Sequence, residues 1–150
     1  MTSVHASVVV PGRVEEAEAL WLDRVRWPSW IDGFAHVQSL DDTWPEPGGR
    51  LRWVSVPRGR GLVSERVIGR RPGHSLTLDV EDEKLQGTQT VTFAAGEDEV
   101  RVTLVLEYEL KDRTPGLVDR FFVRRALRDA LARTVARFGH ERRAELDPPR

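Results

Sequence analysis

In residues 99–110, EVRVTLVLEYEL, every second side chain from Val100 to Tyr108 is apolar. This period of two predicts a β-strand with one buried face and one solvated face. Residues 117–145 contain no proline and a single glycine, and they are rich in Ala, Leu, Arg and Glu. That composition predicts one long amphipathic helix. Together the two segments predict an α+β protein with an antiparallel sheet and a long C-terminal helix.

The sequence before this strand predicts the rest of the sheet. Residues 34–109 alternate between apolar and polar side chains in short runs, which are separated by turns rich in Gly, Pro and acidic residues. Residues 3–10 predict a further strand, so we expect six to seven strands in an antiparallel meander. Two short helices are expected after the first strand, over residues 13–22 and 27–31, and Pro28 suits the first turn of the second.

The composition is that of an ordinary globular protein of 150 residues, 39% apolar and 31% charged. Such a chain buries enough surface for one core, so we expect residues 1–150 to form a single domain. The formal charge of −1 does not favour nucleic acid as a partner, and we interpret the basic residues after Thr114 as a solvated helix face. The absence of cysteine excludes disulfides and thiolate metal sites. Because neither a membrane-spanning run nor a signal peptide is visible, we expect a cytoplasmic protein.

Three local matches carry a resemblance to a known family. They are residues 20–23 (LWLD) followed by residues 26–30 (RWPSW), residues 48–53 (GGRLRW) and residues 71–76 (RPGHSL). In this order of elements they resemble the START/Bet v 1-like superfamily, also called SRPBCC or polyketide cyclase/dehydrase-like. The resemblance implies a helix-grip fold, in which a curved antiparallel sheet wraps around the C-terminal helix and leaves a ligand cavity between them. Because members bind lipids, polyketides, hormones or quinones, and only some are enzymes, the fold alone does not assign a function.

Turn lengths predict which side chains meet on the concave face of the sheet. We expect Val80 to pair with Leu85 and Phe93 to pair with Val102, because both registers put large apolar side chains on one face. Gly87 then leaves a gap in mid-strand, which indicates either a bulge or room for a ligand. One end of the face would gather an amide and a hydroxyl around this gap, through Gly87, Gln89, Leu106 and Tyr108.

Glu65 is a candidate general acid or base. If Val67 pairs with Leu78, the Glu65 side chain lies on the same face as Val67. A buried carboxylate is costly and its pKa rises, which is how many catalytic acids and bases arise. The alternative register turns Ser64 and Arg66 inward instead, and the sequence leaves both registers open.

The long helix carries two arginines within its apolar stripe. Arg124 and Arg128 fall between Phe121 and Leu131 on this stripe, while Phe122 and Arg125 lie along its shoulder. The simplest interpretation is that the arginine stems cover apolar surface at the mouth of the cavity. The alternative is an arginine clamp for a carboxylate, phosphate or enolate oxygen.

These arguments predict a set of cavity residues. We expect Trp30 in the core, Trp44 on a loop at the entrance, and Trp53 in the cavity wall. The catalytic candidates are Glu65, Tyr108 and Arg128. The predicted ligand-binding residues are Trp53, Ser55, Leu78, Gly87, Gln89, Val91, Phe93, Leu104, Leu106, Tyr108, Phe121, Phe122, Arg125 and Arg128.

Three functions remain open at this stage. The histidines lack the spacing of metal ligands and no nucleophile motif occurs, so we expect no metal and no cofactor. The first function is a non-enzymatic carrier or sensor of a small hydrophobic molecule such as a lipid, quinone or polyketide. The second is a polyketide cyclase, aromatase or dehydratase, and the third is a docking module for a protein partner. We expect a small hydrophobic ligand, no nucleic acid, no membrane insertion, and a monomer or homodimer.

Overall fold

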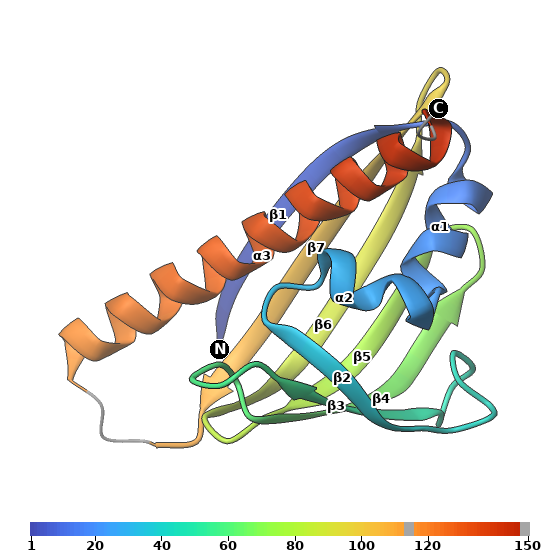
Figure 1. The fold of residues 1–150 in the computed structure, drawn as a ribbon. Helices are drawn as coiled ribbons and strands as arrows, with labels where there is room; N and C mark the ends of the chain where they lie inside the picture. The colour runs from blue at the N-terminus through green and yellow to red at the C-terminus, as the bar shows by residue number, and fades with distance from the viewer. Residues whose placement is uncertain (113–115, 148–150) are drawn as a thin grey trace.

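The computed structural model of the chain describes residues 1–112 and 116–147. Within these ranges it contains a seven-stranded antiparallel sheet in the order β1-β7-β6-β5-β4-β3-β2, so the first strand lies beside the last. Figure 1 shows that this sheet curves around the long helix α3, which confirms the predicted helix-grip fold. The strands are β1 (Thr2–Pro11), β2 (Phe34–Leu40), β3 (Arg50–Ser55), β4 (Leu62–Arg71), β5 (Ser75–Glu81), β6 (Leu85–Ala95) and β7 (Glu99–Leu110).

Short helices follow β1, as the sequence predicts, and their termini are stabilised locally. The Glu16 carboxylate accepts the backbone N–H of Arg13 at 2.9 Å at the start of α1, where the helix dipole favours a negative charge. Pro28 occupies the first turn of α2, where a missing N–H costs nothing. The helical segments are α1 (Val14–Leu22), the 3-10 turn η1 (Arg24–Arg26), α2 (Trp27–Trp30) and α3 (Leu117–Leu146).

Helix α3 is held in place by its second half. Leu131 and Phe138 are buried, and the Phe138 ring lies 5.1 Å from the ring of Trp21 and 5.2 Å from that of Trp30. In contrast, no side chain in residues 117–130 is fully buried. The helix is therefore packed against β1 and the short helices at one end only. No helix in residues 1–112 or 116–147 is long and apolar enough to cross a membrane.

One predicted strand register is confirmed, and one that the sequence leaves open is decided. Phe93 pairs with Val102 between β6 and β7, and Val67 pairs with Leu78 between β4 and β5. The second pairing settles the alternatives that the sequence leaves open for β4. Glu65 therefore lies on the concave face, because it is two residues from Val67.

The predicted pairing of Val80 with Leu85 is wrong. Val80 pairs with Gly87, so the register between β5 and β6 is shifted by two residues. The reason is the turn, in which the buried Asp82 carboxylate accepts the backbone N–H groups of Lys84 at 2.8 Å and Leu85 at 3.0 Å. Because the shift is even, every side chain keeps the face that we predicted for it.

Gly87 does not leave room for a ligand. A Cβ atom at this position would clash with the carbonyl oxygen of Glu107 and would lie 2.8 Å from the Cα of Tyr108. The space is therefore filled by the backbone of β7, which approaches β6 closely here. Glycine is required because any side chain would push the two central strands apart.

We expect Gly87→Ala to lower the free energy of unfolding by about 1–3 kcal/mol, because the added methyl group overpacks the sheet. Urea denaturation measures this change. Gly69→Ala is the matched control, since a Cβ there meets its nearest neighbour, the Thr77 Cβ, at an ordinary 3.9 Å. Equal stability losses in the two variants would contradict the prediction.

Candidate functional site

A cavity of about 360 Å³ lies between α3 and the concave face of the sheet. We call it the central cavity. Its walls come from α1, α2, α3 and strands β3 to β7, together with the loops at residues 41–49 and 56–61. The volume is within the range of small-molecule sites, about 300–1,000 Å³.

Five tryptophans form much of the cavity wall: Trp21, Trp27, Trp30, Trp44 and Trp53. Their rings brace one another, with centroids 4.4 Å apart for Trp21 and Trp30 and 5.2 Å apart for Trp27 and Trp44. Trp30 is buried, as expected, and Trp44 lies on the loop between β2 and β3. Such a cluster makes a stiff, largely apolar wall with indole N–H groups as its polar atoms.

Small residues on α3 keep the other side of the cavity open. Ala126 and Ala130 line it, together with Thr134 one turn further along. The Thr134 hydroxyl oxygen accepts the backbone N–H of Asp32 at 3.0 Å, and the Asp32 carboxylate pairs with Arg133 at 2.9 Å. These contacts connect the helix to the end of α2 and hold the cavity rim in place.

Glu65 lines the central cavity from strand β4. Burial raises its pKa from 4.5 to about 7, because a charged carboxylate is poorly solvated there. The charge of Arg60 and a hydrogen bond from the indole N–H of Trp53 act in the opposite direction. The carboxyl group is thus poised to gain or lose a proton near neutral pH.

Arg60 reaches the cavity from the loop between β3 and β4. Its Nε donates to the Asp82 carboxylate at 2.7 Å, and its guanidinium carbon lies 5.8 Å from the centroid of the Trp53 ring. Asp82 is almost fully buried and also caps the next turn, so it fixes this arginine in position. The loop is therefore attached to the cavity wall by an ion pair and a cation–π contact.

Three donors on cavity-lining residues have no acceptor. They are Trp30 Nε1, Trp44 Nε1 and Arg60 Nη2, which are buried and find no hydrogen-bond partner among the residues that the structure describes. Buried donors are normally paired, and leaving one unpaired costs about 1–3 kcal/mol. The wall of the cavity thus carries three unpaired hydrogen-bond donors as well as the carboxylates of Asp32 and Glu65.

The structure brings six of the predicted ligand-binding residues to the central cavity. They lie on β3, β5, β6 and β7, and all belong to the concave face. Gln89 is the polar residue that β6 contributes to the cavity wall, as predicted, and it pairs with Leu106 on the neighbouring strand β7. The six residues are Trp53, Ser55, Leu78, Gln89, Leu104 and Leu106.

The remaining predicted residues lie elsewhere, and their assignment to the cavity is corrected. Val91 and Phe93 are buried in the core, where Phe93 packs 6.4 Å from Trp21. Gly87 borders a groove on the opposite face of the sheet, which is lined by charged residues. The space that its side chain would occupy is filled by the backbone of β7. Four residues of α3 are exposed because the first turns of the helix do not pack on the sheet: Phe121, Phe122, Arg125 and Arg128.

Tyr108 borders a separate groove of about 610 Å³ between the end of β7 and the start of α3. Phe121 and Arg124 line the same groove. Burial raises the pKa of Tyr108, while the charge of Arg124 and a hydrogen bond with Thr2 oppose this rise. Of the three catalytic candidates, only Glu65 therefore lies in the central cavity.

Several residues of the cavity wall are not predicted from the sequence. Arg60 follows a Pro-Gly turn, and no local pattern indicates that such a loop folds back over a sheet. Trp21 and Trp27 belong to the quoted motifs, so their aromatic character was a usable signal. Ala126 and Ala130 are small residues that lie three or four positions from apolar neighbours. This pattern is as typical of close helix packing as of a cavity wall. In the described part of the chain, no group of three or more His, Asp or Glu side chains is placed to hold a metal ion.

A helix-grip fold with a central cavity between sheet and helix defines a class of ligand-binding proteins. The chain belongs to the family described as "Polyketide cyclase / dehydrase and lipid transport", whose model matches residues 1–140. This membership confirms the resemblance to the START/Bet v 1-like superfamily. No curated protein sequence matches the chain.

Solved structures with the same fold come from distant organisms. TTHA0849 from Thermus thermophilus has a TM-score of 0.74 at 21% identity, covering 96% of this chain and 99% of that one. A START superfamily protein from Mycobacterium smegmatis has a TM-score of 0.69 at 15% identity, with coverages of 95% and 98%. Norcoclaurine synthase from Thalictrum flavum, in complex with dopamine and hydroxybenzaldehyde, has a TM-score of 0.64 at 14% identity, with coverages of 99% and 88%. At these identities the likeness shows the fold.

The raised pKa of Glu65 predicts a specific dependence of stability on pH. Between pH 4.5 and about 7 the folded chain keeps a proton that the unfolded chain loses. The free energy of unfolding should therefore fall as pH rises through this window, by about 3 kcal/mol for this group. Glu65→Gln removes the titration, so its urea stability should exceed that of the wild type at pH 8 and match it more closely at pH 5.

Glu97→Gln is the matched control, because it removes an exposed carboxylate in the turn between β6 and β7. It should leave the wild-type difference between pH 5 and pH 8 in place. Parallel pH profiles for wild type and Glu65→Gln would show that Glu65 is not the group with the raised pKa.

Proposed function

We propose that the chain binds a small, largely apolar molecule in the central cavity and acts as its carrier or sensor. The observation that carries the proposal is the cavity itself, about 360 Å³ in volume and walled by tryptophans and leucines. Apolar walls with a few fixed polar groups are typical of small-molecule sites. The family description, which includes lipid transport, is consistent with this function.

The unpaired donors support a ligand that carries acceptor oxygens. Trp30 Nε1, Trp44 Nε1 and Arg60 Nη2 find no partner in the described part of the chain, and a carbonyl or carboxylate oxygen would satisfy them. Quinones, polyketides and fatty acids all combine an apolar body with such oxygens. A pure hydrocarbon would leave the donors unpaired, and we therefore expect it to bind more weakly.

One observation favours a second function, an enzyme that moves protons on a bound carbonyl compound. Glu65 lies in the apolar cavity and burial raises its pKa to about 7, the range in which a general acid or base works best at neutral pH. The unpaired donors of Trp44 and Arg60 would stabilise the oxygen of an enolate as it forms. This combination suits a polyketide cyclase, aromatase or dehydratase.

We expect Ala130→Phe to weaken ligand binding at least about tenfold, because the added ring fills the cavity next to Leu131. Binding of a 1,4-naphthoquinone and of a long-chain fatty acid is measured by quenching of tryptophan fluorescence and by calorimetry. Ala132→Phe is the control, since Ala132 is exposed on the same helix. Equal affinities in both variants, or no binding by the wild type, would refute a cavity ligand of these classes.

The enzyme function is tested by deuterium uptake at the α-carbon of an aryl β-keto thioester. The wild-type rate should rise with pH through about 7 as Glu65 ionises, and Glu65→Gln should fall to the background rate while still binding the thioester. A Glu65→Gln rate equal to that of the wild type would leave binding as the function.

A further inference from the structure

The first turns of α3 present an apolar surface that residues 1–112 and the rest of residues 116–147 do not cover. Leu117 is 86% exposed, Val118 66%, Phe121 63% and Phe122 59%. The two phenylalanine rings contact each other edge to face, with centroids 6.1 Å apart. None of the four residues lines the central cavity, so their exposure is independent of the proposed ligand. We call them the α3 apolar patch.

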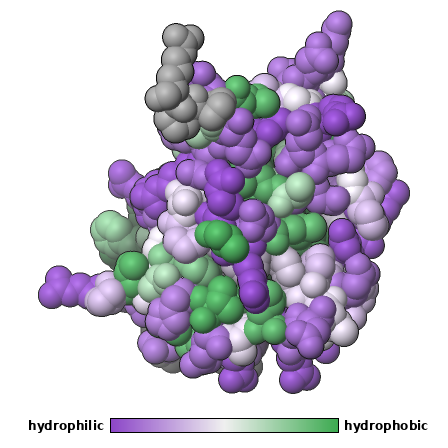
Figure 2. Space-filling model, turned by 45° about the vertical axis from the view of Figure 1, so that its right-hand side comes forward, coloured by the Kyte–Doolittle hydropathy of each residue, from purple (hydrophilic) through white to green (hydrophobic). Residues whose placement is uncertain are grey.

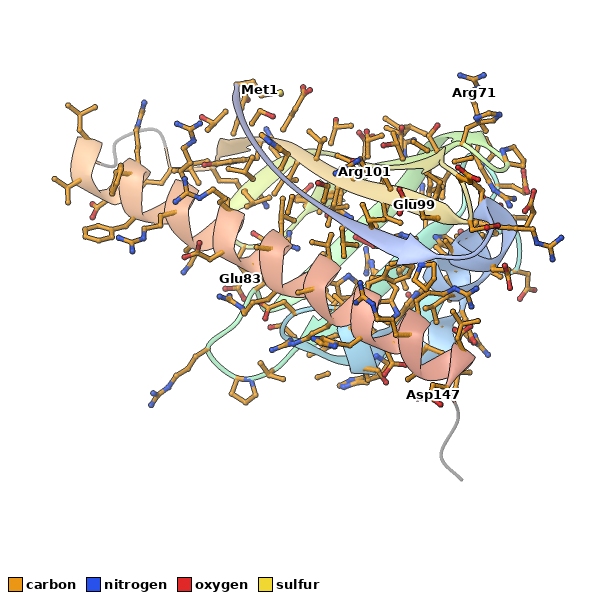
Figure 3. The ribbon with its side chains drawn as sticks, turned by 90° about the horizontal axis from the view of Figure 1, so that it is seen from above. Met1, Arg71, Glu83, Glu99, Arg101 and Asp147 are labelled. Atoms are coloured by element: carbon orange, nitrogen blue, oxygen red, sulfur yellow. The ribbon has the colours of Figure 1, made fainter. Side chains whose placement is uncertain are left out.

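The figures show where the patch lies. In Figure 3, seen from above, the first turns of α3 extend past the ends of the strands, at the same end of the molecule as Met1. Hydrophobic residues also gather on the different face drawn in Figure 2, among hydrophilic surroundings, so exposure alone does not select a site. What distinguishes the α3 apolar patch is the charge that accompanies it.

Arginines continue the same face of the helix. Leu117, Phe121, Arg125 and Arg128 follow one another at intervals of three or four residues, so they form one line along the helix. Arg120 and Arg124 are exposed beside this line. Residues 117–130 carry four arginines and two aspartates.

We infer that the α3 apolar patch docks the protein onto an anionic lipid surface. Interfacial helices bury their apolar residues by about 5–10 Å and place basic residues among the lipid headgroups. Arg125 lies four residues beyond Phe121, which is about 6 Å along a helix axis. When the first turns dip into the bilayer surface, Arg125 and Arg128 therefore reach the phosphate groups while the second half of α3 stays packed on the sheet.

Charge selects the lipid surface over a second copy of the chain. A symmetric dimer through the α3 apolar patch would bring Arg125 and Arg128 of each protomer close to the same arginines of the other. Like charges at an interface oppose association. An anionic surface is complementary to both parts of the face, because it accepts the aromatic rings and the arginines together.

The experiment is flotation of the full chain with two kinds of vesicle, phosphatidylcholine alone and phosphatidylcholine mixed with phosphatidylglycerol. We expect binding to the mixed vesicles that weakens with added salt. Phe121→Asp/Phe122→Asp should reduce the partition coefficient at least about tenfold, and Arg125→Gln and Arg128→Gln should each reduce it about fivefold. Val25→Asp is the control, because Val25 is 78% exposed but lies in η1.

Several results would overturn the inference. No binding by the wild type, or equal binding to both vesicles, would exclude an anionic surface. Binding that survives Phe121→Asp/Phe122→Asp would show adsorption by another face. A dimer in sedimentation equilibrium that this double variant abolishes would identify a second copy as the occupant. Circular dichroism and urea stability establish that each variant is folded.

Discussion

The packing of Phe138 against Trp21 and Trp30 is the contact on which the rest of the structure depends. It connects the second half of α3 with α1 and α2, at ring distances of 5.1 and 5.2 Å, and Phe138 has no exposed surface. Because this cluster fixes the helix at one end, the helix does not need to collapse onto the sheet along its whole length. The small side chains of Ala126 and Ala130 then leave space above the concave face. A cavity is the result of a helix anchored at one end over a curved sheet.

The polar groups of the cavity are unusual for the interior of a folded protein. A carboxyl at Glu65 with a pKa near 7, and donors on Trp44 and Arg60 without acceptors, each reduce the stability of the empty protein. A core selected for stability alone would hold apolar side chains at these positions. Such local costs concentrate at functional sites, where a ligand supplies the missing partner. Arg60 is an example. Asp82 holds its Nε in place, while its Nη2 has no partner among the described residues and could bind a ligand.

The sequence predicted the fold and the buried face of β5, β6 and β7, but it left the face of β4 open and did not give the extent of the site. Alternation along residues 99–110 and the turn before it were enough to pair Phe93 with Val102, because local spacing sets both. The β5–β6 register was missed by two residues, since the side chain of Asp82, rather than the turn length, determines it. Phe121 was predicted to face the cavity because it belongs to an apolar stripe, but it is exposed. Such a stripe indicates a contact with another apolar surface and does not identify that surface. Arg60 was missed because its position depends on contacts between distant segments.

The unequal packing of α3 also determines where the cavity can open. From Leu131 to Arg142 six residues of the helix are buried, whereas residues 117–130 have none. Local opening costs least where few buried apolar contacts must break, so the first half of α3 moves more easily than the second. Ala126 and Leu127 belong to this first half and line the cavity, so displacing them exposes its interior. The residues that close the cavity and those that present an apolar surface to the outside therefore belong to the same weakly held helical segment.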